Sequence, residues 1–138
     1  MRVVLLLLCF LVVAAAGMRD TRKIVQQRNA DLAVVHWASA RTGPYATVLA
    51  SGITQTLQYG STLRPIELYD TSPGQLRTLV RQHPHLYLLV AVPDMEGQWA
   101  RLNPGRDYRL LATSLGLQEL GQFQGYTLFR VGHARDIA

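Results

Sequence analysis

Cysteine is almost absent from this sequence. The only one in 138 residues, Cys9, lies in an apolar stretch near the N-terminus. A single cysteine excludes an intramolecular disulfide, a Cys-rich zinc site and a dithiol redox pair. The fold is therefore expected to hold together by side-chain packing alone. At this length one domain with a modest core fits, and a second does not.

Motifs that carry familiar chemistry are also missing. The sequence has no G-x-G-x-x-G fingerprint and no Walker loop, which removes the usual nucleotide sites. It has no G-x-S-x-G elbow for a serine hydrolase and no H-E-x-x-H helix for a zinc enzyme. Proline separates the two closest histidines and makes joint metal ligation awkward. We therefore expect no metal site, no cofactor and no catalytic residue. The histidines are His36, His83, His85 and His133.

Basic residues outnumber acidic ones by 14 to 9, which gives a net charge of +5. Four of them, Arg19, Arg22, Lys23 and Arg28, directly follow the apolar stretch, and the others are scattered singly. Bases beside an apolar segment are typical of a membrane flank. Nucleic-acid binding would instead favour a long basic run or basic and aromatic residues interleaved on a strand. The charge pattern predicts contact with membrane lipid and no binding of nucleic acid.

The apolar stretch comprises residues 3–16, VVLLLLCFLVVAAA. It is short for a transmembrane helix, which needs about 20 residues to cross about 30 Å of hydrocarbon. One interpretation is a secretory signal that begins at Arg2 and is cleaved after Ala14-Ala15-Ala16. Another is the end of a transmembrane helix, such as the last of several in a longer protein, and a third is a buried core helix. The bases that follow favour the anchor. We divide the chain into an anchor or signal segment, residues 1–18, and a soluble domain, residues 19–138.

A helix is expected directly after this segment, with Asp20 or Thr21 as its cap and its end before Gly43-Pro44. Trp37 lies opposite the apolar stripe of this helix. It suits either a membrane interface or packing on the domain itself. The stripe that we expect to be buried consists of Ile24, Val25, Leu32 and Val35.

The remaining sequence alternates between strand and helix. Ser72-Pro73-Gly74-Gln75 predicts a capping box, and Asn103-Pro104 repeats the cap-then-proline signal. The unbroken apolar run at residues 86–92 predicts a central parallel strand. The fold class is therefore α/β: a small three-layer domain with a mainly parallel sheet and a C-terminal β-hairpin, preceded by an N-terminal apolar helix. Strands are expected at residues 46–50, 65–69, 86–92, 117–123 and 126–131, and helices at 54–59, 73–82 and 104–115.

The carboxyl ends of parallel strands are where ligands bind in such sheets. A small-residue turn follows the first strand, and its amides and hydroxyls suit either an anion or the cap of the next helix. Two aspartates follow strands that we expect to be adjacent, where they form either a carboxylate pair or ordinary turns. Glu96 lies nearby in the sequence. The candidate binding residues are Ser51, Gly52, Thr54, Asp70 and Asp94.

Three stretches of the chain resemble a known family. They are ATVLASGITQTLQYGSTLRPIELYD, HPHLYLLVAVPDMEGQW and DYRLLATSLGLQELGQFQGYTLFRV, and they follow an apolar helix and a basic amphipathic stretch. Together they resemble the C-terminal region of bacterial polytopic glycosyltransferases of the protein mannosyltransferase and aminoarabinose transferase type. That region is a small α/β domain on the extracytoplasmic face, after the last membrane helix.

The resemblance implies a location at the inner membrane, with the soluble domain outside the cytoplasm and the membrane region of a glycosyltransferase as partner. The sugar donor in that family is lipid-linked, and its acidic catalytic residues lie in a loop that no position here matches. We therefore expect a terminal domain or fragment that is non-catalytic by itself. The alternative is an exported or membrane-anchored α/β module that binds a small ligand or a protein partner.

Overall fold

The computed structural model describes residues 2–132, and the side chains from residue 21 onward. His133, one of the histidines considered as a metal ligand, lies outside the described residues. The side chains of the apolar stretch, residues 3–16, lie outside them as well. The elements are α1 (Arg2–Thr42), β1 (Thr47–Ala50), α2 (Thr54–Gly60), β2 (Arg64–Glu67), the 3-10 helix η1 (Leu68–Asp70), α3 (Pro73–Gln82), β3 (Leu86–Val90), α4 (Val92–Glu96), α5 (Asn103–Leu110), the π-helical turn η2 (Leu111–Leu115), β4 (Leu117–Phe123) and β5 (Tyr126–Val131).

The five strands form one mixed sheet in the order β2-β1-β3-β5-β4. β1 is parallel to β2 and to β3, whereas β5 is antiparallel to both β3 and β4. The expected C-terminal hairpin is confirmed, and its turn residues Gln124 and Gly125 both have positive φ, as a type I′ turn requires. The expectation of a mainly parallel sheet is wrong. β5 is the more buried strand of the hairpin and takes the inner position, so it adds an antiparallel pairing to β3.

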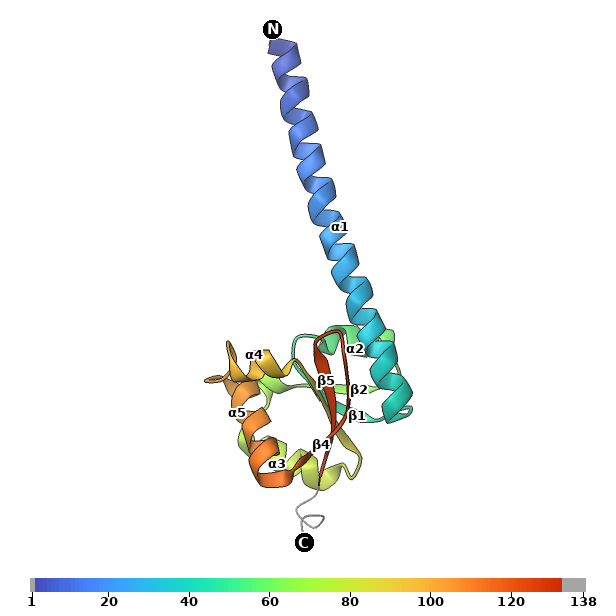
Figure 1. The fold of residues 1–138 in the computed structure, drawn as a ribbon, viewed down its shortest axis with the longest axis vertical. Helices are drawn as coiled ribbons and strands as arrows, with labels where there is room; N and C mark the ends of the chain where they lie inside the picture. The colour runs from blue at the N-terminus through green and yellow to red at the C-terminus, as the bar shows by residue number, and fades with distance from the viewer. Residues whose placement is uncertain (1, 133–138) are drawn as a thin grey trace.

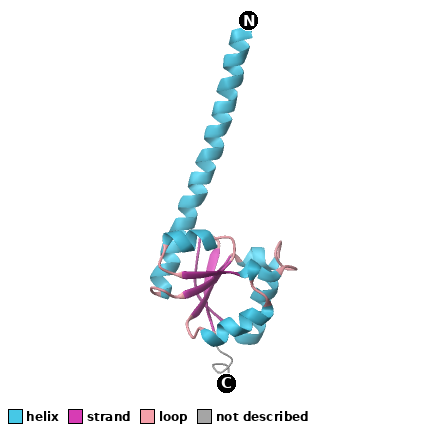
Figure 2. Cartoon of the chain, turned by 180° about the vertical axis from the view of Figure 1, so that it is seen from behind, coloured by secondary structure: helices cyan, strands magenta, loops and turns pink. Residues whose placement is uncertain are grey.

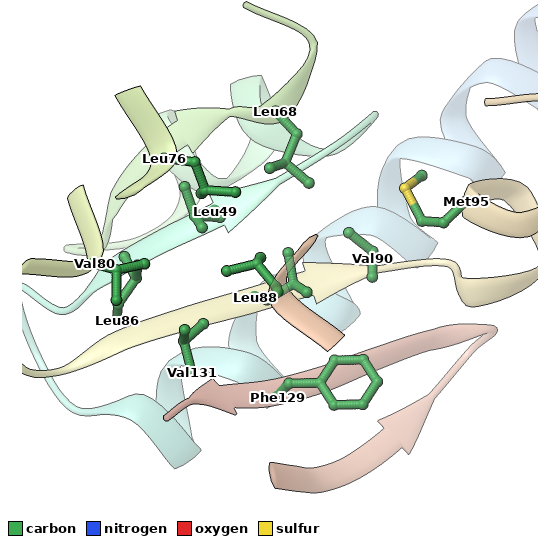
Figure 3. Packing of buried hydrophobic residues seen from close by; sticks show 11 residues of the cluster. Leu49, Leu68, Leu76, Val80, Leu86, Leu88, Val90, Met95, Phe129 and Val131 are labelled. Atoms are coloured by element: carbon green, nitrogen blue, oxygen red, sulfur yellow. The ribbon is translucent and has the colours of Figure 1, made fainter. Parts of the chain in front are cut away.

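Helices cover both faces of the sheet (Figure 2). Successive side chains of a strand point to opposite faces, so Leu88 and Leu89 of the central strand β3 enter two different cores. The Leu88 core includes Leu76 of α3 and Met95 of α4, and Figure 3 shows these side chains converging on the sheet. The core on the other face is closed by α1 and α2. These two cores confirm that the run at residues 86–92 supplies the central strand.

α1 is a single helix of 41 residues that extends far beyond the sheet (Figure 1). The expected boundary and cap at Asp20 or Thr21 are wrong, because no proline interrupts the helix and Gly17 alone does not end it. The expected stripe is buried only in its last part. Ile24 and Val25 are 68% and 52% exposed, because this part of α1 lies beyond the sheet and packs against no other described element. Val35, near the C-terminal end of α1, is fully buried.

Among residues 21–132, whose side chains the structure describes, no helix combines the length and the apolar character needed to cross a bilayer.

Trp37 packs on its own domain. Its ring stacks on that of Phe123 with centroids 5.7 Å apart, and the guanidinium of Arg41 lies 4.8 Å from its centre. The hairpin thereby rests against the last turns of α1. Of the two interpretations of this residue, packing on the domain is the one that the structure bears out.

The cap signals are confirmed in one helix and not in the other. In α3 the Gln75 amide donates to the Ser72 hydroxyl, and the Gln75 side chain accepts from the Ser72 amide, which completes the capping box. In α5 the N-cap is Leu102, and Asn103 instead donates from its side chain to the carbonyl of Tyr69 at 3.2 Å. β3 ends at Val90, two residues earlier than expected, because Val92 and Pro93 already form the first turn of a further short helix, α4.

At Gly105 α5 meets α4 and the segment that follows α4. A Cβ at this position would lie 2.4 Å from the carbonyl oxygen of Trp99 and 2.7 Å from that of Met95. Both contacts are with backbone atoms, which cannot rotate away. The helix can approach this closely only because residue 105 has no side chain.

Replacing Gly105 with alanine is expected to lower the free energy of unfolding by about 2–3 kcal/mol, because the methyl group forces two backbone segments apart. The matched control is Gly74→Ala in α3, where nothing lies within 4 Å of the added Cβ. The Gly74→Ala change should leave the free energy of unfolding within about 1 kcal/mol of that of the parent protein. Urea denaturation followed by circular dichroism measures both, and equal stability of the two variants would contradict the packing described here.

Candidate functional site

A cleft of about 310 Å³ lies at the carboxyl ends of β1, β2 and β3. This is the edge of the sheet where the parallel strands of an α/β domain present their ligand sites. The three strands bring Ser51, Glu67 and Ala91 to one place, and Tyr126 joins them at the start of β5. Its neighbour Thr127 pairs with Val90, so Tyr126 lies beside the end of β3.

The turn after β1 brings two of the candidate residues, Ser51 and Gly52, to the cleft. Gly52 has φ +80, and a Cβ there would approach the Tyr126 hydroxyl to 4.0 Å. Neither Ser51 nor Thr54 caps α2, whose N-cap is Ile53 without a side-chain hydrogen bond. The capping interpretation of this turn is therefore wrong.

Thr54 acts on the cleft through Glu67. Its hydroxyl donates to Glu67 Oε2 at 2.6 Å, and the backbone amide of Tyr69 donates to Oε1 at 3.2 Å. Both carboxylate oxygens are therefore held by hydrogen bonds, which fixes the orientation of the negative charge. Glu67 lines the cleft and was not among the residues expected there, although it ends a parallel strand just as Ala50 does.

Asp70 and Asp94 do not come together as neighbours at the sheet edge. β1 lies between β2 and β3, so the strands that precede these two residues are not adjacent. Asp94 lines the cleft, whereas Asp70 lines a separate groove between β2 and α3. The carboxylate that accompanies Asp94 in the cleft is that of Glu67. Glu96 is exposed outside it.

Aromatic side chains form much of the wall of the cleft. The rings of Tyr69 and Trp99 meet edge to face, with centroids 6.0 Å apart and planes at 83°. Tyr126 is half-buried, and its pKa is raised by burial first and then by the negative charges of Asp31 and Asp94. No sequence pattern links these three rings, because they come from separate elements: η1, the segment after α4, and β5.

The lining carries two carboxylates and no lysine or arginine among the described residues. This does not support the anion-binding interpretation of the turn at Ser51-Gly52, because an anion would meet like charge. Among the side chains that the structure describes, no three His, Cys, Asp or Glu residues gather closely enough to hold a metal ion. His83 instead lies 3.4 Å from the Thr47 hydroxyl.

Asp107 is a buried acid that lies outside the cleft. Its side chain is fully buried in α5, and neither carboxyl oxygen has a hydrogen-bond partner. Burial without a partner disfavours the charged form and raises the pKa of Asp107 from 3.8 to about 6. The folded state therefore binds this proton more tightly than the unfolded chain does.

This raised pKa sets the sign of a pH effect. Well below pH 3.8 the residue is protonated in both states and contributes no penalty. Between that pH and about 6 the unfolded chain releases the proton while the folded state keeps it, so stability falls, and above pH 6 the full loss remains. The loss amounts to about 3 kcal/mol at pH 8 for a shift of about two pKa units.

Replacing Asp107 with asparagine is expected to remove this pH-dependent loss. The stability of the variant relative to the parent should improve by about 2.5 kcal/mol between pH 4 and pH 8, because asparagine carries no charge to bury. Urea denaturation at the two pH values measures the change. The control is Asp70→Asn at an exposed position, which should change stability little at either pH. If the stability of D107N relative to the parent did not vary with pH, the raised pKa of the buried Asp107 carboxyl would be contradicted.

Comparison of the chain with known protein families, with curated proteins and with solved structures finds no match.

Proposed function

We propose that this chain is a membrane-attached α/β domain, non-catalytic by itself, that binds a ligand in the cleft at the carboxyl ends of β1, β2 and β3. The observation that carries the proposal is the continuity of α1. One helix contains the apolar run of residues 3–16 and also supplies Val34, Val35 and Ala38 to the core. Because α1 is one continuous helix, the domain stays attached to whatever environment the apolar run enters.

The apolar run favours lipid as that environment. Leaving such side chains in water costs about 0.8 kcal/mol for each exposed CH₂ group. At 1.5 Å per residue, Arg19 to Arg28 occupy the next part of the helix, about 15 Å long, where anionic headgroups attract basic side chains. Ile24 and Val25 are exposed on the same part of the helix, as suits an interfacial segment.

The resemblance supports a more specific context. In this proposal the chain is the C-terminal extracytoplasmic domain, or a fragment, of an inner-membrane glycosyltransferase that uses lipid-linked sugar, and it packs on the membrane region of that enzyme. An upstream reading frame that encodes several apolar helices would favour this context. A start at Met1 with processing after Ala16 would favour the alternative, an exported binding module, whose ligand site is the same cleft.

Membrane attachment is expected to depend on the apolar run. Full-length protein should float with lipid vesicles and resist extraction at alkaline pH. The double substitution Leu6→Arg/Leu7→Arg should release it, because each arginine costs about 2.5–3.5 kcal/mol at the centre of a membrane helix. The control Tyr45→Arg, at an exposed position of the domain, should stay bound. Full-length chain that dissolves as a monomer without detergent would contradict the proposal.

The chain alone is expected to transfer no sugar, because no position matches the family's acidic catalytic loop. Purified full-length protein incubated with polyprenyl-phosphate-linked sugar and an acceptor should give no more product than a control without protein. Turnover that scales with protein concentration would overturn this expectation.

A further inference from the structure

We propose that the cleft binds an organic ammonium ion, either as a free small molecule or as the headgroup of a lipid, because the carboxylates of Glu67 and Asp94 lie there together with the rings of Tyr69, Trp99 and Tyr126. This inference rests on the proposed function, since it names the ligand of the same cleft.

The charge of the cleft is opposite to that of the whole chain. The chain has 14 basic and 9 acidic residues, yet the described lining has two acids and no base. Carboxylates in a concave site with partly apolar walls concentrate the negative potential and raise the local concentration of cations. The site therefore selects ligands by positive charge.

The aromatic walls decide which kind of cation fits. Organic ammonium groups bind over the faces of Trp and Tyr rings, and several rings arranged at angles form a cage for them. Tyr69 and Trp99 meet edge to face at 83° in the lining of the cleft, and Tyr126 adds a third aromatic side chain. A hard metal ion instead requires several oxygen ligands at once. The cleft volume of about 310 Å³ also lies at the lower end of the range for small-molecule sites.

One carboxylate is positioned before any ligand arrives. Glu67 is held by the Thr54 hydroxyl at 2.6 Å and by the Tyr69 amide at 3.2 Å. The second of these hydrogen bonds links the Glu67 carboxylate to Tyr69, whose ring also lines the cleft. A preoriented charge loses little conformational entropy on binding. Asp94, in the first turn of α4, is exposed and completes the pair of charges.

The cleft lies toward the end of the domain from which α1 projects. Figure 1 shows α2, α4 and the β4–β5 turn at that end, and Asp31 of α1 is close enough to Tyr126 to affect it electrostatically. If α1 inserts in lipid as proposed, the cleft faces the bilayer. A headgroup that bears an ammonium group is then a natural source of the ligand, beside free solutes of the same chemistry.

Trp99 provides the readout. The chain has two tryptophans, so full-length Trp37→Phe protein in maltoside detergent reports on the cleft alone. Titration with tetramethylammonium should give a saturable change in Trp99 emission. The neutral isostere tert-butanol, and sodium chloride at equal ionic strength, should not. No saturable change, or an equal response to tert-butanol, would overturn the proposal.

Matched variants locate the site. In the same background, Glu67→Gln/Asp94→Asn should weaken tetramethylammonium binding about tenfold, since it removes both charges and leaves the rings. Asp70→Asn, which removes an acid outside the cleft, should stay within about twofold. Circular dichroism confirms that each variant is folded. Equal weakening by the two variants would overturn the assignment to this cleft.

Vesicles separate the two sources of ligand. In phosphatidylglycerol vesicles Trp99 should respond fully to added tetramethylammonium. In vesicles that also contain phosphatidylethanolamine, a diminished response identifies the headgroup as occupant, and an undiminished one identifies a free solute. Vesicle attachment without any ammonium response refutes only this inference. Binding by protein that fails to attach refutes the membrane proposal instead.

Discussion

Burial of the central strand on both faces is the constraint on which the rest of the structure depends. Leu88 and Leu89 are consecutive and both fully buried, so each face of the sheet needs a covering layer of helices. α1 and α2 cover one face, and α3 to α5 cover the other. The lower part of α1 therefore belongs to the core of the domain, and its upper part projects as a continuation of the same helix.

The same arrangement creates the cleft. Because β1, β2 and β3 are parallel, their carboxyl ends open at one edge, and three different turns leave the sheet there. The antiparallel strand β5 begins at that edge and adds Tyr126. A wholly parallel sheet would have placed the carboxyl end of a strand at this position. The mixed sheet thus adds a ring to a site whose charges come from the parallel strands and α4.

The wall that carries Met95 and Trp99 depends on α5 behind it. Gly105 allows the backbone of α5 to contact the carbonyl groups of both residues, and Arg109 donates to the Ala100 carbonyl at 2.7 Å. Asp107, in the same helix, is buried without a partner and weakens the fold as the pH rises. α5 therefore supports the wall of the cleft through its backbone contacts and also carries the buried acid that lowers the stability of the fold at higher pH.

The sequence by itself determined the local features: the capping box at Ser72, the hairpin turn at Gln124-Gly125 and the apolar central strand. Each depends on neighbours within a few residues, so it can be recognised without a fold. The rule about strand ends also placed Ser51, Gly52 and Asp94 at the cleft. Only the tertiary structure decided which side chains met there, because strand order is not encoded locally. It separated Asp70 from Asp94 by inserting β1, brought Glu67, Trp99 and Tyr126 together from distant segments, and left Ile24 and Val25 exposed where α1 runs past the sheet.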